Sequence, residues 1–147
     1  MKNSKRDTCR TGSIYEKRFE LFCLENGIEI WKPIGNQTHE DYVIWHESRF
    51  KKVNIKYRSF NKHNRFAIQL ISKSGGIIKM NYLDSDIDCL ILATDRLDGF
   101  FLLDLGLFKN TGSKYPSISL TKEKLLALKL TSKIEQTHDK VENLCAT

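Results

Sequence analysis

The residues between positions 41 and 56 combine a carboxylate, an amide and an ammonium group. Asp41 opens one β-like run, and Asn54 and Lys56 lie on the next. If the runs form a hairpin through residues 46–49, Asp41 and Asn54 become near neighbours, with Lys56 on the same face as Asn54 because side chains alternate along a strand. Carboxylate and amide oxygens suit Mg²⁺, which needs few protein ligands because it keeps several waters. Such an ion polarises a phosphoryl oxygen and activates water, and a lysine orients or deprotonates the nucleophile, which together predict phosphodiester hydrolysis.

Positive charge is concentrated beside these residues. The chain of 147 residues has a net charge of +6, and residues 48–65 hold seven Lys or Arg and no Asp or Glu. The rest of the chain has a balance of −1, so all the excess positive charge lies in this segment. Aromatic residues are interleaved with it, at Phe50, Tyr57 and Phe60, which is typical of nucleic-acid binding. The alternative is a solvated hairpin whose basic residues protect a strand edge from pairing.

The surrounding sequence predicts one α/β domain, or an α+β one, with a mixed central sheet flanked by helices. A helix is expected at 13–27, with Ser13 and Glu16 at capping-box spacing. Strands are predicted at 28–34, 41–45, 50–57 and 66–71, and a buried strand at 89–94 with a hairpin partner at 100–104. Residues 77–86 are ambiguous between a short helix and a turn. Two helical patterns, at 121–130 and 132–145, form a C-terminal extension.

The order of these elements resembles the PD-(D/E)XK nuclease superfamily. The resemblance runs from about Gly12 to Phe108, through a helix bearing Glu16, a strand opened by Asp41 and the triplet Asn54-Ile55-Lys56. The stretches "GSIYEKRFELFCLENGIEIWKPIG" and "DIDCLILATDRLDGFFLLD" look like the small bacterial branch, which includes homing endonucleases of group I introns. The resemblance implies a restriction-endonuclease-like core.

The resemblance also implies a role for each residue. Asp41 would be the central metal ligand, Asn54 and the Ile55 backbone carbonyl further ligands, and Lys56 the catalytic lysine. Glu16 would reach the metal or its water, although the capping box alone could explain it. The cofactor would be Mg²⁺, or another divalent cation such as Mn²⁺ or Ca²⁺.

Two positions depart from the family pattern. Glu40 stands where the family has Pro, which shapes the chain without taking part in the chemistry. Asn54 stands where an acid or Gln is expected, and because its amide is uncharged and short, metal affinity and activity should fall.

Seven further residues, mostly in the basic segment, are expected to contact DNA. They are Lys52, Arg58, Lys62, Arg65, Gln69, Ser72 and Lys73. As single residues these could equally be solvated charge or polar surface, but beside a phosphodiesterase site we expect the group to hold phosphates.

The function expected is metal-dependent, site-specific cleavage of double-stranded DNA by an intron homing endonuclease. The alternatives are a Holliday-junction resolvase, a DNA-binding module with impaired catalysis, and an RNA-binding accessory domain. A chain with one site needs a partner to cut both strands, so a homo-oligomer, dimer or tetramer, is predicted, with the C-terminal helices as the contact. A His-Asn-His site from His46, Asn54 and His63 is disfavoured, because His63 precedes a strand-like run instead of lying on a helix.

The remaining sequence predicts three segments of a single domain: a flexible basic arm at 1–12, a nuclease core at 13–108, and a loop with helices at 109–147. No apolar run approaches the roughly 18–20 residues that a membrane span requires, and no signal peptide is recognisable. The four cysteines, Cys9, Cys23, Cys89 and Cys145, lack metal-site spacing and are expected to be free thiols. These features favour the cytoplasm, with nucleoid association when the protein is bound to DNA.

Overall fold

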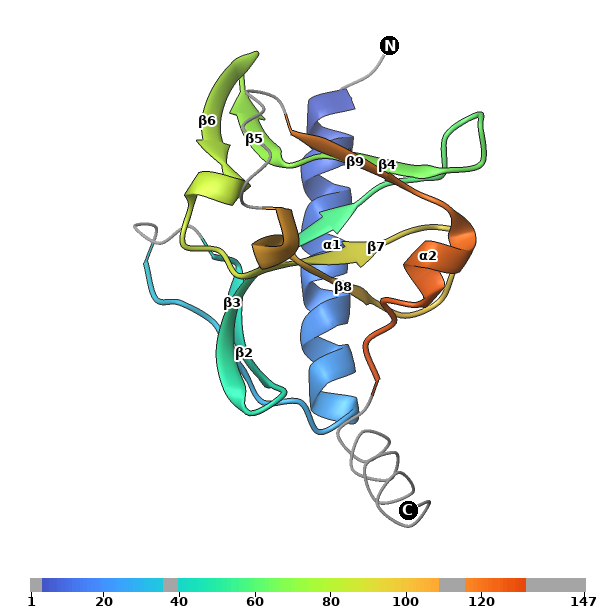
Figure 1. Ribbon diagram of the computed structural model, residues 1–147. Coiled ribbons are helices and arrows are strands. Elements are labelled where there is room, and N and C mark those ends of the chain that lie inside the picture. Colours follow the sequence, from blue (N-terminus) through green and yellow to red (C-terminus); the bar gives the residue numbers. More distant parts are fainter. Residues whose placement is uncertain (1–3, 36–39, 109–115, 132–147) are drawn as a thin grey trace.

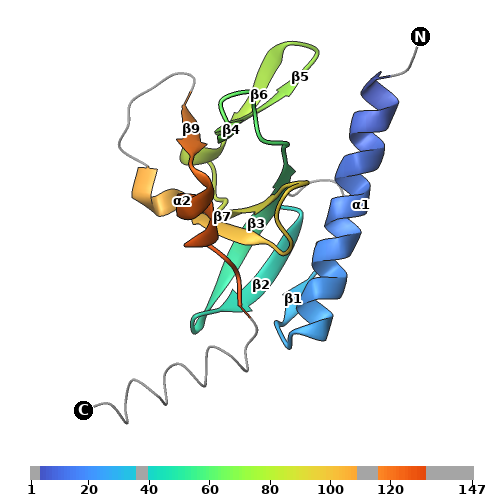
Figure 2. The same ribbon diagram turned by 90° about the vertical axis from the view of Figure 1, so that its right-hand side faces the viewer.

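The architecture is a five-stranded mixed sheet with one long helix against one face (Figures 1 and 2). The structure is a computed structural model that describes residues 4–35, 40–108 and 116–131. The sheet order is β1-β2-β3-β7-β8, in which β3 and β7 are parallel and the other neighbours antiparallel. The helix is α1 (Ser4–Glu25), and the strands are β1 (Ile30–Trp31), β2 (Tyr42–His46), β3 (Arg49–Tyr57), β7 (Cys89–Ala93) and β8 (Phe101–Asp104). The predicted mixed central sheet and α/β class are confirmed.

Smaller elements cover the other face of the sheet. They are two two-stranded sheets, β4 (Phe66–Gln69) with β9 (Ser117–Leu120) and β5 (Ile71–Ser74) with β6 (Ile77–Asn81), together with the short helices η1 (Tyr82–Asp84), η2 (Leu105–Phe108) and α2 (Lys122–Leu126). Because β7 is buried along its whole length, its sequence CLILA is continuously apolar. Its alternate side chains enter two cores, Ile91 toward α1 and Leu90 and Leu92 toward the smaller sheets.

Helix α1 is longer than its capping signal predicted. It is helical from Ser4, so Ser13 lies in its interior and cannot be its N-cap. Residues 4–12 therefore belong to the helix and not to the expected flexible arm; Gly12 weakens a helix by only about 1 kcal/mol, which neighbouring turns offset. One face of the helix packs on the sheet: Phe19 and Cys23 are fully buried against β2, β3 and β7.

The β2–β3 hairpin is confirmed, and its turn has the geometry that suits a hairpin. Glu47 and Ser48 have φ of 51° and 64°, so both adopt the left-handed conformation of a two-residue turn. The predicted strand at 28–34 is shorter, because only Ile30 and Trp31 pair with β2. The hairpin of β7 with β8 is also confirmed.

The greatest differences from prediction lie in residues 66–86. The single strand expected at 66–71 divides at Leu70 into β4 and β5, which pair with different partners. The ambiguous segment 77–86 is mostly strand β6 followed by η1, and a two-residue turn of Gly75 and Gly76, with φ of 59° and 81°, joins β5 to β6.

The C-terminal predictions are tested only in part. The helix expected at 121–130 is observed only as the five-residue α2. Its Leu125 is fully buried in the core and does not form part of an exposed contact face. The helix expected at 132–145 lies outside the described residues, as does Cys145. Cys23 and Cys89 are buried free thiols. None of the helices described is long and apolar enough to cross a membrane.

Phe19→Ala should destabilise the protein by about 3–5 kcal/mol, because the ring is fully buried and its loss leaves a cavity between α1 and the sheet. Urea unfolding followed by circular dichroism measures this change. The matched control is Leu24→Ala on the same helix, whose side chain is 68% exposed and whose loss should change stability by less than about 0.5 kcal/mol. Equal losses in the two variants would contradict the placement of α1.

Candidate active site

Asp41 lies just before β2 and is bonded to β3 by both its backbone and its side chain. Its N–H donates to Asn54 Oδ1 at 2.8 Å and to the Val53 carbonyl at 3.0 Å. Its Oδ2 accepts the Ile55 N–H at 2.9 Å. Asp41 and Asn54 are therefore neighbours, as the hairpin predicted, and the Asp41 carboxylate replaces a strand backbone in pairing with β3.

This geometry also fixes the direction of the Ile55 carbonyl. Since the N–H and C=O of one residue point to the same side of an extended strand, the Ile55 carbonyl points toward the side occupied by the Asp41 carboxylate. A carboxylate oxygen and a backbone carbonyl oxygen thus face the same space.

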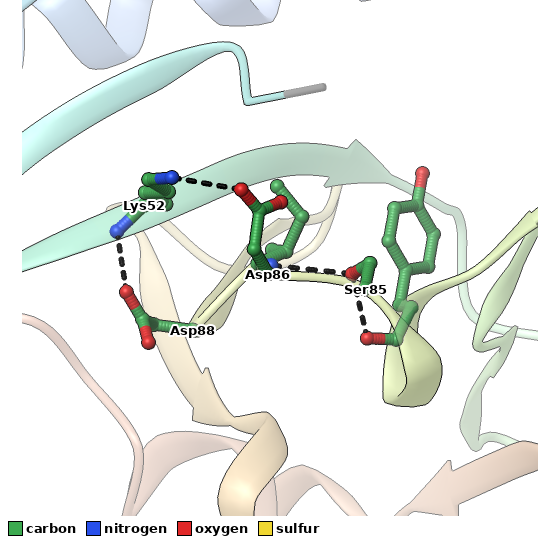
Figure 3. Close-up of polar contacts among 6 residues, drawn as sticks. Lys52, Ser85, Asp86 and Asp88 are labelled. Carbon is green, nitrogen blue, oxygen red and sulfur yellow. Dashed lines mark hydrogen bonds and ion pairs between the residues drawn. The ribbon is translucent and has the colours of Figure 1, made fainter. Parts of the chain in front are cut away.

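Lys56 lies two residues beyond Asn54, on the sheet face opposite α1. Its ammonium nitrogen is 4.9 Å from the centre of the Tyr82 ring, a cation–π contact that restrains the lysine. Two interactions of Lys52 connect the segment after Tyr82 to β3 (Figure 3). Lys52 Nζ lies 2.7 Å from Asp86 Oδ2, and the Lys52 backbone N–H donates to Asp88 Oδ2 at 2.9 Å. Within that segment the Ser85 hydroxyl donates to the Tyr82 carbonyl at 2.8 Å. Lys52 therefore helps to hold the ring beneath Lys56.

Glu16 reaches the same site from α1. The Tyr42 hydroxyl lies 3.0 Å from Glu20 Oε2 and 3.3 Å from the Glu16 carbonyl oxygen, which fixes the helix against the start of β2. Because Ser13 is inside the helix, the capping box no longer accounts for Glu16. Glu16 lines the same cavity as Asp41.

The predicted catalytic residues line one surface cavity of about 470 Å³. Its walls are formed by Glu16, Asp41, Asn54, Ile55, Lys56, Ser72, Lys79, Met80 and Tyr82. Burial raises the pKa of the Asp41 carboxyl, although the Ile55 N–H and Lys56 lower it. Burial also raises the pKa of Glu16, and the negative charge of Asp41 raises it further. The two carboxylates therefore destabilise each other when ionised, which a cation between them would relieve.

The donor set fits a hard divalent cation with bound waters. It comprises the carboxylates of Asp41 and Glu16 and the carbonyl of Ile55, all oxygen donors. Asn54 Oδ1 already accepts the Asp41 N–H and has one remaining lone pair for an ion. No group of three or more His, Cys, Asp or Glu that could hold a metal occurs among the described residues, so a site here depends on carbonyl oxygens and water.

Most of the predicted DNA-contacting residues gather beside this cavity. A groove of about 760 Å³ is lined by Lys56, Arg58, Ala67, Ile68, Gln69, Ile71, Ser72, Lys73, Ser117, Ile118 and Ser119. Lys56 and Ser72 line both the cavity and the groove, which makes the two continuous. Arg65 borders the groove through a bond from its Nε to Ser119 Oγ at 2.8 Å. Lys62 lies in an exposed loop outside the groove lining, and Lys52 is paired with Asp86.

The rival His-Asn-His arrangement is not assembled. His46 is buried with its Nδ1 2.9 Å from Lys51 Nζ, on the face of the hairpin toward α1. Asn54 is on the opposite face, and His63 lies in an exposed turn.

Several lining residues were not found from the sequence. Lys79 and Tyr82 belong to the segment left ambiguous, although the Gly75-Gly76 pair between two β-like runs was a usable hairpin signal. Ser117 was assigned to the end of a loop and Ser119 to no element, and they enter the groove only because β9 pairs with the distant β4.

Asp41→Asn should stabilise the protein at pH 7 by about 0.5–2 kcal/mol, the range that single stabilising substitutions commonly give. Because the folded pKa of Asp41 is raised, ionisation destabilises the wild type as pH rises from the ordinary Asp pKa of about 3.9 through the folded value. The advantage of the variant should therefore shrink as pH falls toward about 4. Thermal unfolding at several pH values measures it, with the exposed Asp98→Asn as control. A variant less stable than wild type at pH 7 would contradict this account.

The comparisons with known proteins rest on structure, because no protein family and no curated protein matches the sequence. The fold is similar to that of a bacterial homing endonuclease, I-Ssp6803I. The TM-score is 0.56 at 20% sequence identity, and the match covers 83% of this chain and 78% of that one. This likeness establishes the fold: a mixed sheet with an attached helix, shared with that enzyme.

Proposed function

We propose that the protein is a Mg²⁺-dependent DNA endonuclease that hydrolyses phosphodiester bonds in double-stranded DNA. The observation that carries the proposal is the meeting of Glu16, Asp41 and Lys56 in one cavity that opens into a basic groove. Carboxylates beside a lysine suit metal-assisted phosphodiester hydrolysis, and the groove suits the neighbouring phosphates. The shared fold with a bacterial homing endonuclease supports the same reaction. We extend the proposal to membership of the PD-(D/E)XK superfamily and to an intron homing role.

In this proposal the acidic residues would hold the cation, and the basic residues would contact the phosphates. A bound Mg²⁺ would supply polarisation of a phosphoryl oxygen and a lower pKa of bound water. Asp41 and Glu16 provide the negative charge that holds a cation, and the Asp41 carboxylate is kept in orientation by the Ile55 N–H. Lys56, restrained over Tyr82, places a positive charge where the scissile phosphate gains negative charge. Arg58 and Lys73 in the groove hold the adjoining phosphates.

Cutting both strands of a duplex requires two such cavities, so we propose a homodimer or homotetramer with matching symmetry on its target. Leu125 of α2 is buried in the core and is therefore not available for this proposed contact.

A second candidate function is a DNA-binding module with impaired catalysis. It is favoured by one observation, namely that Asn54 Oδ1 is already bonded to the Asp41 N–H at 2.8 Å and carries no charge. The groove would still bind DNA in such a module.

Lys56→Met should lower Mg²⁺-dependent cleavage by roughly 10²–10³-fold, because it removes the charge beside the phosphate while keeping most of the length of the side chain. Cleavage is measured on random duplex, a four-way junction and RNA, each with Mg²⁺ and with EDTA. The control is Lys122→Met on α2, outside the lining of the cavity and groove, which should cut as wild type does. Cleavage in EDTA, or preference for the junction or RNA, would contradict the proposal. Binding of duplex without any cleavage would favour the impaired module.

Asn54→Glu should increase Mg²⁺ affinity and cleavage, since it adds a carboxylate to a site that now holds a neutral amide. The same change should lower the melting temperature in EDTA, because a third negative charge would adjoin Asp41 and Glu16, whose pKa values burial already raises. Cleavage against Mg²⁺ concentration and thermal unfolding with and without Mg²⁺ give the two readouts. Asn54→Gln serves as the uncharged control with a longer reach. If neither variant raises cleavage, position 54 is not a ligand position.

A further inference from the structure

The β4–β9 ribbon has two faces of different character. Phe66 and Ile68 of β4 are buried, and Ile118 and Leu120 of β9 pack against the same core. The alternate residues form the exposed outer face: Ala67 lies opposite Ser119, and Gln69 lies opposite Ser117. Figure 2 shows the ribbon on the far side of the central sheet from α1.

The outer face is unusual for this chain because it is small, neutral and polar. Charged residues make up 29% of the sequence, and exposed strands commonly use lysine to block pairing. Here the four outward positions carry one alanine, one glutamine and two serines. The basic residues stand around them instead: Lys56, Arg58 and Lys73 line the same groove, and none of its described lining residues is acidic.

We propose that this face, Ala67, Gln69, Ser117 and Ser119, reads base edges in the DNA major groove. The inference rests on the proposed function and adds the element that selects the sequence. A two-stranded ribbon fits a major groove of about 12 Å width, and strands of four residues span about 13 Å. Small side chains allow close approach, Gln can bond adenine in a bidentate manner, Ser bonds either donors or acceptors, and an Ala methyl can contact the thymine methyl.

The available hydrogen-bonding groups agree with this assignment. Within the described part of the chain, no hydrogen bond occupies the side chain of Gln69 or Ser117. Ser119 is different, since Arg65 donates to its Oγ at 2.8 Å, and this bond holds the arginine at the edge of the ribbon. Gln69 and Ser117 form the facing pair best suited to read bases, while Arg65 and Lys73 are placed to hold phosphates on either side.

The test separates sequence preference from general affinity. The preferred duplex of the wild type is selected from a random library, and affinities for that duplex and for random duplex are measured by fluorescence anisotropy in EDTA, so that no strand is cut. In the double variant Gln69→Ala, Ser117→Ala the ratio of the two affinities should fall by roughly 5- to 150-fold. Affinity for random duplex and its salt dependence should stay as in wild type, because no charge is lost.

The matched control is Lys73→Ala, which should weaken both affinities alike and reduce the slope of log affinity against log salt by about one. Thermal unfolding of the double variant checks that the exposed substitutions leave the fold intact. If the wild type cuts its selected site and the double variant keeps the wild-type ratio, the inference about the ribbon is wrong while the proposed function stands. A wild type that binds duplex without preference overturns both the ribbon inference and site specificity, and one that neither binds nor cuts DNA overturns the proposed function as well.

Discussion

The candidate site depends on the replacement of a strand backbone by one side chain. Strand β2 begins at Tyr42, and the Asp41 carboxylate then accepts the Ile55 N–H that a longer β2 would have bonded. The reciprocal bond from the Asp41 N–H to Asn54 Oδ1 fixes the register at this point. Because side chains alternate along β3, this register sends Asn54 and Lys56 into the cavity and Val53 toward α1. A shift of one residue would reverse these faces and separate the carboxylate from the lysine.

The sheet makes this arrangement rigid on both sides. Strand β3 pairs in parallel with β7, which is buried along its whole length. Side chains of β7 pack in both hydrophobic cores, so the position of β7 is fixed from both faces of the sheet. The bonds from Lys52 to Asp86 and Asp88 attach the following turn to β3 and thereby bring Tyr82 under Lys56. The Lys52–Asp86 ion pair is exposed and screened by solvent, so its role is to position the turn more than to stabilise the fold.

Local patterns predicted the parts of the structure that are close in sequence. The β2–β3 hairpin, the buried β7 and the second half of α1 followed from periodicity and turn residues. The expected hairpin also placed Asp41 and Asn54 as neighbours. Pairing between distant segments did not follow: β4 and β9 are about fifty residues apart, so nothing near Gln69 indicated that Ser117 would lie opposite. The start of α1 was misplaced because the polar segment before Ser13, with Gly12, resembled a helix boundary, whereas the helix begins at Ser4.

The side-chain amide of Asn54 has two separate tasks to consider. One task is to accept the Asp41 N–H, which an amide oxygen does at 2.8 Å and which a carboxylate would also do. The other, under the proposed function, would be to hold a cation, for which charge matters. Glu16 and Asp41 are already hard to ionise together, since burial and mutual repulsion raise the pKa of Glu16. An amide keeps the hydrogen bond that sets the register without adding a third negative charge beside Asp41 and Glu16.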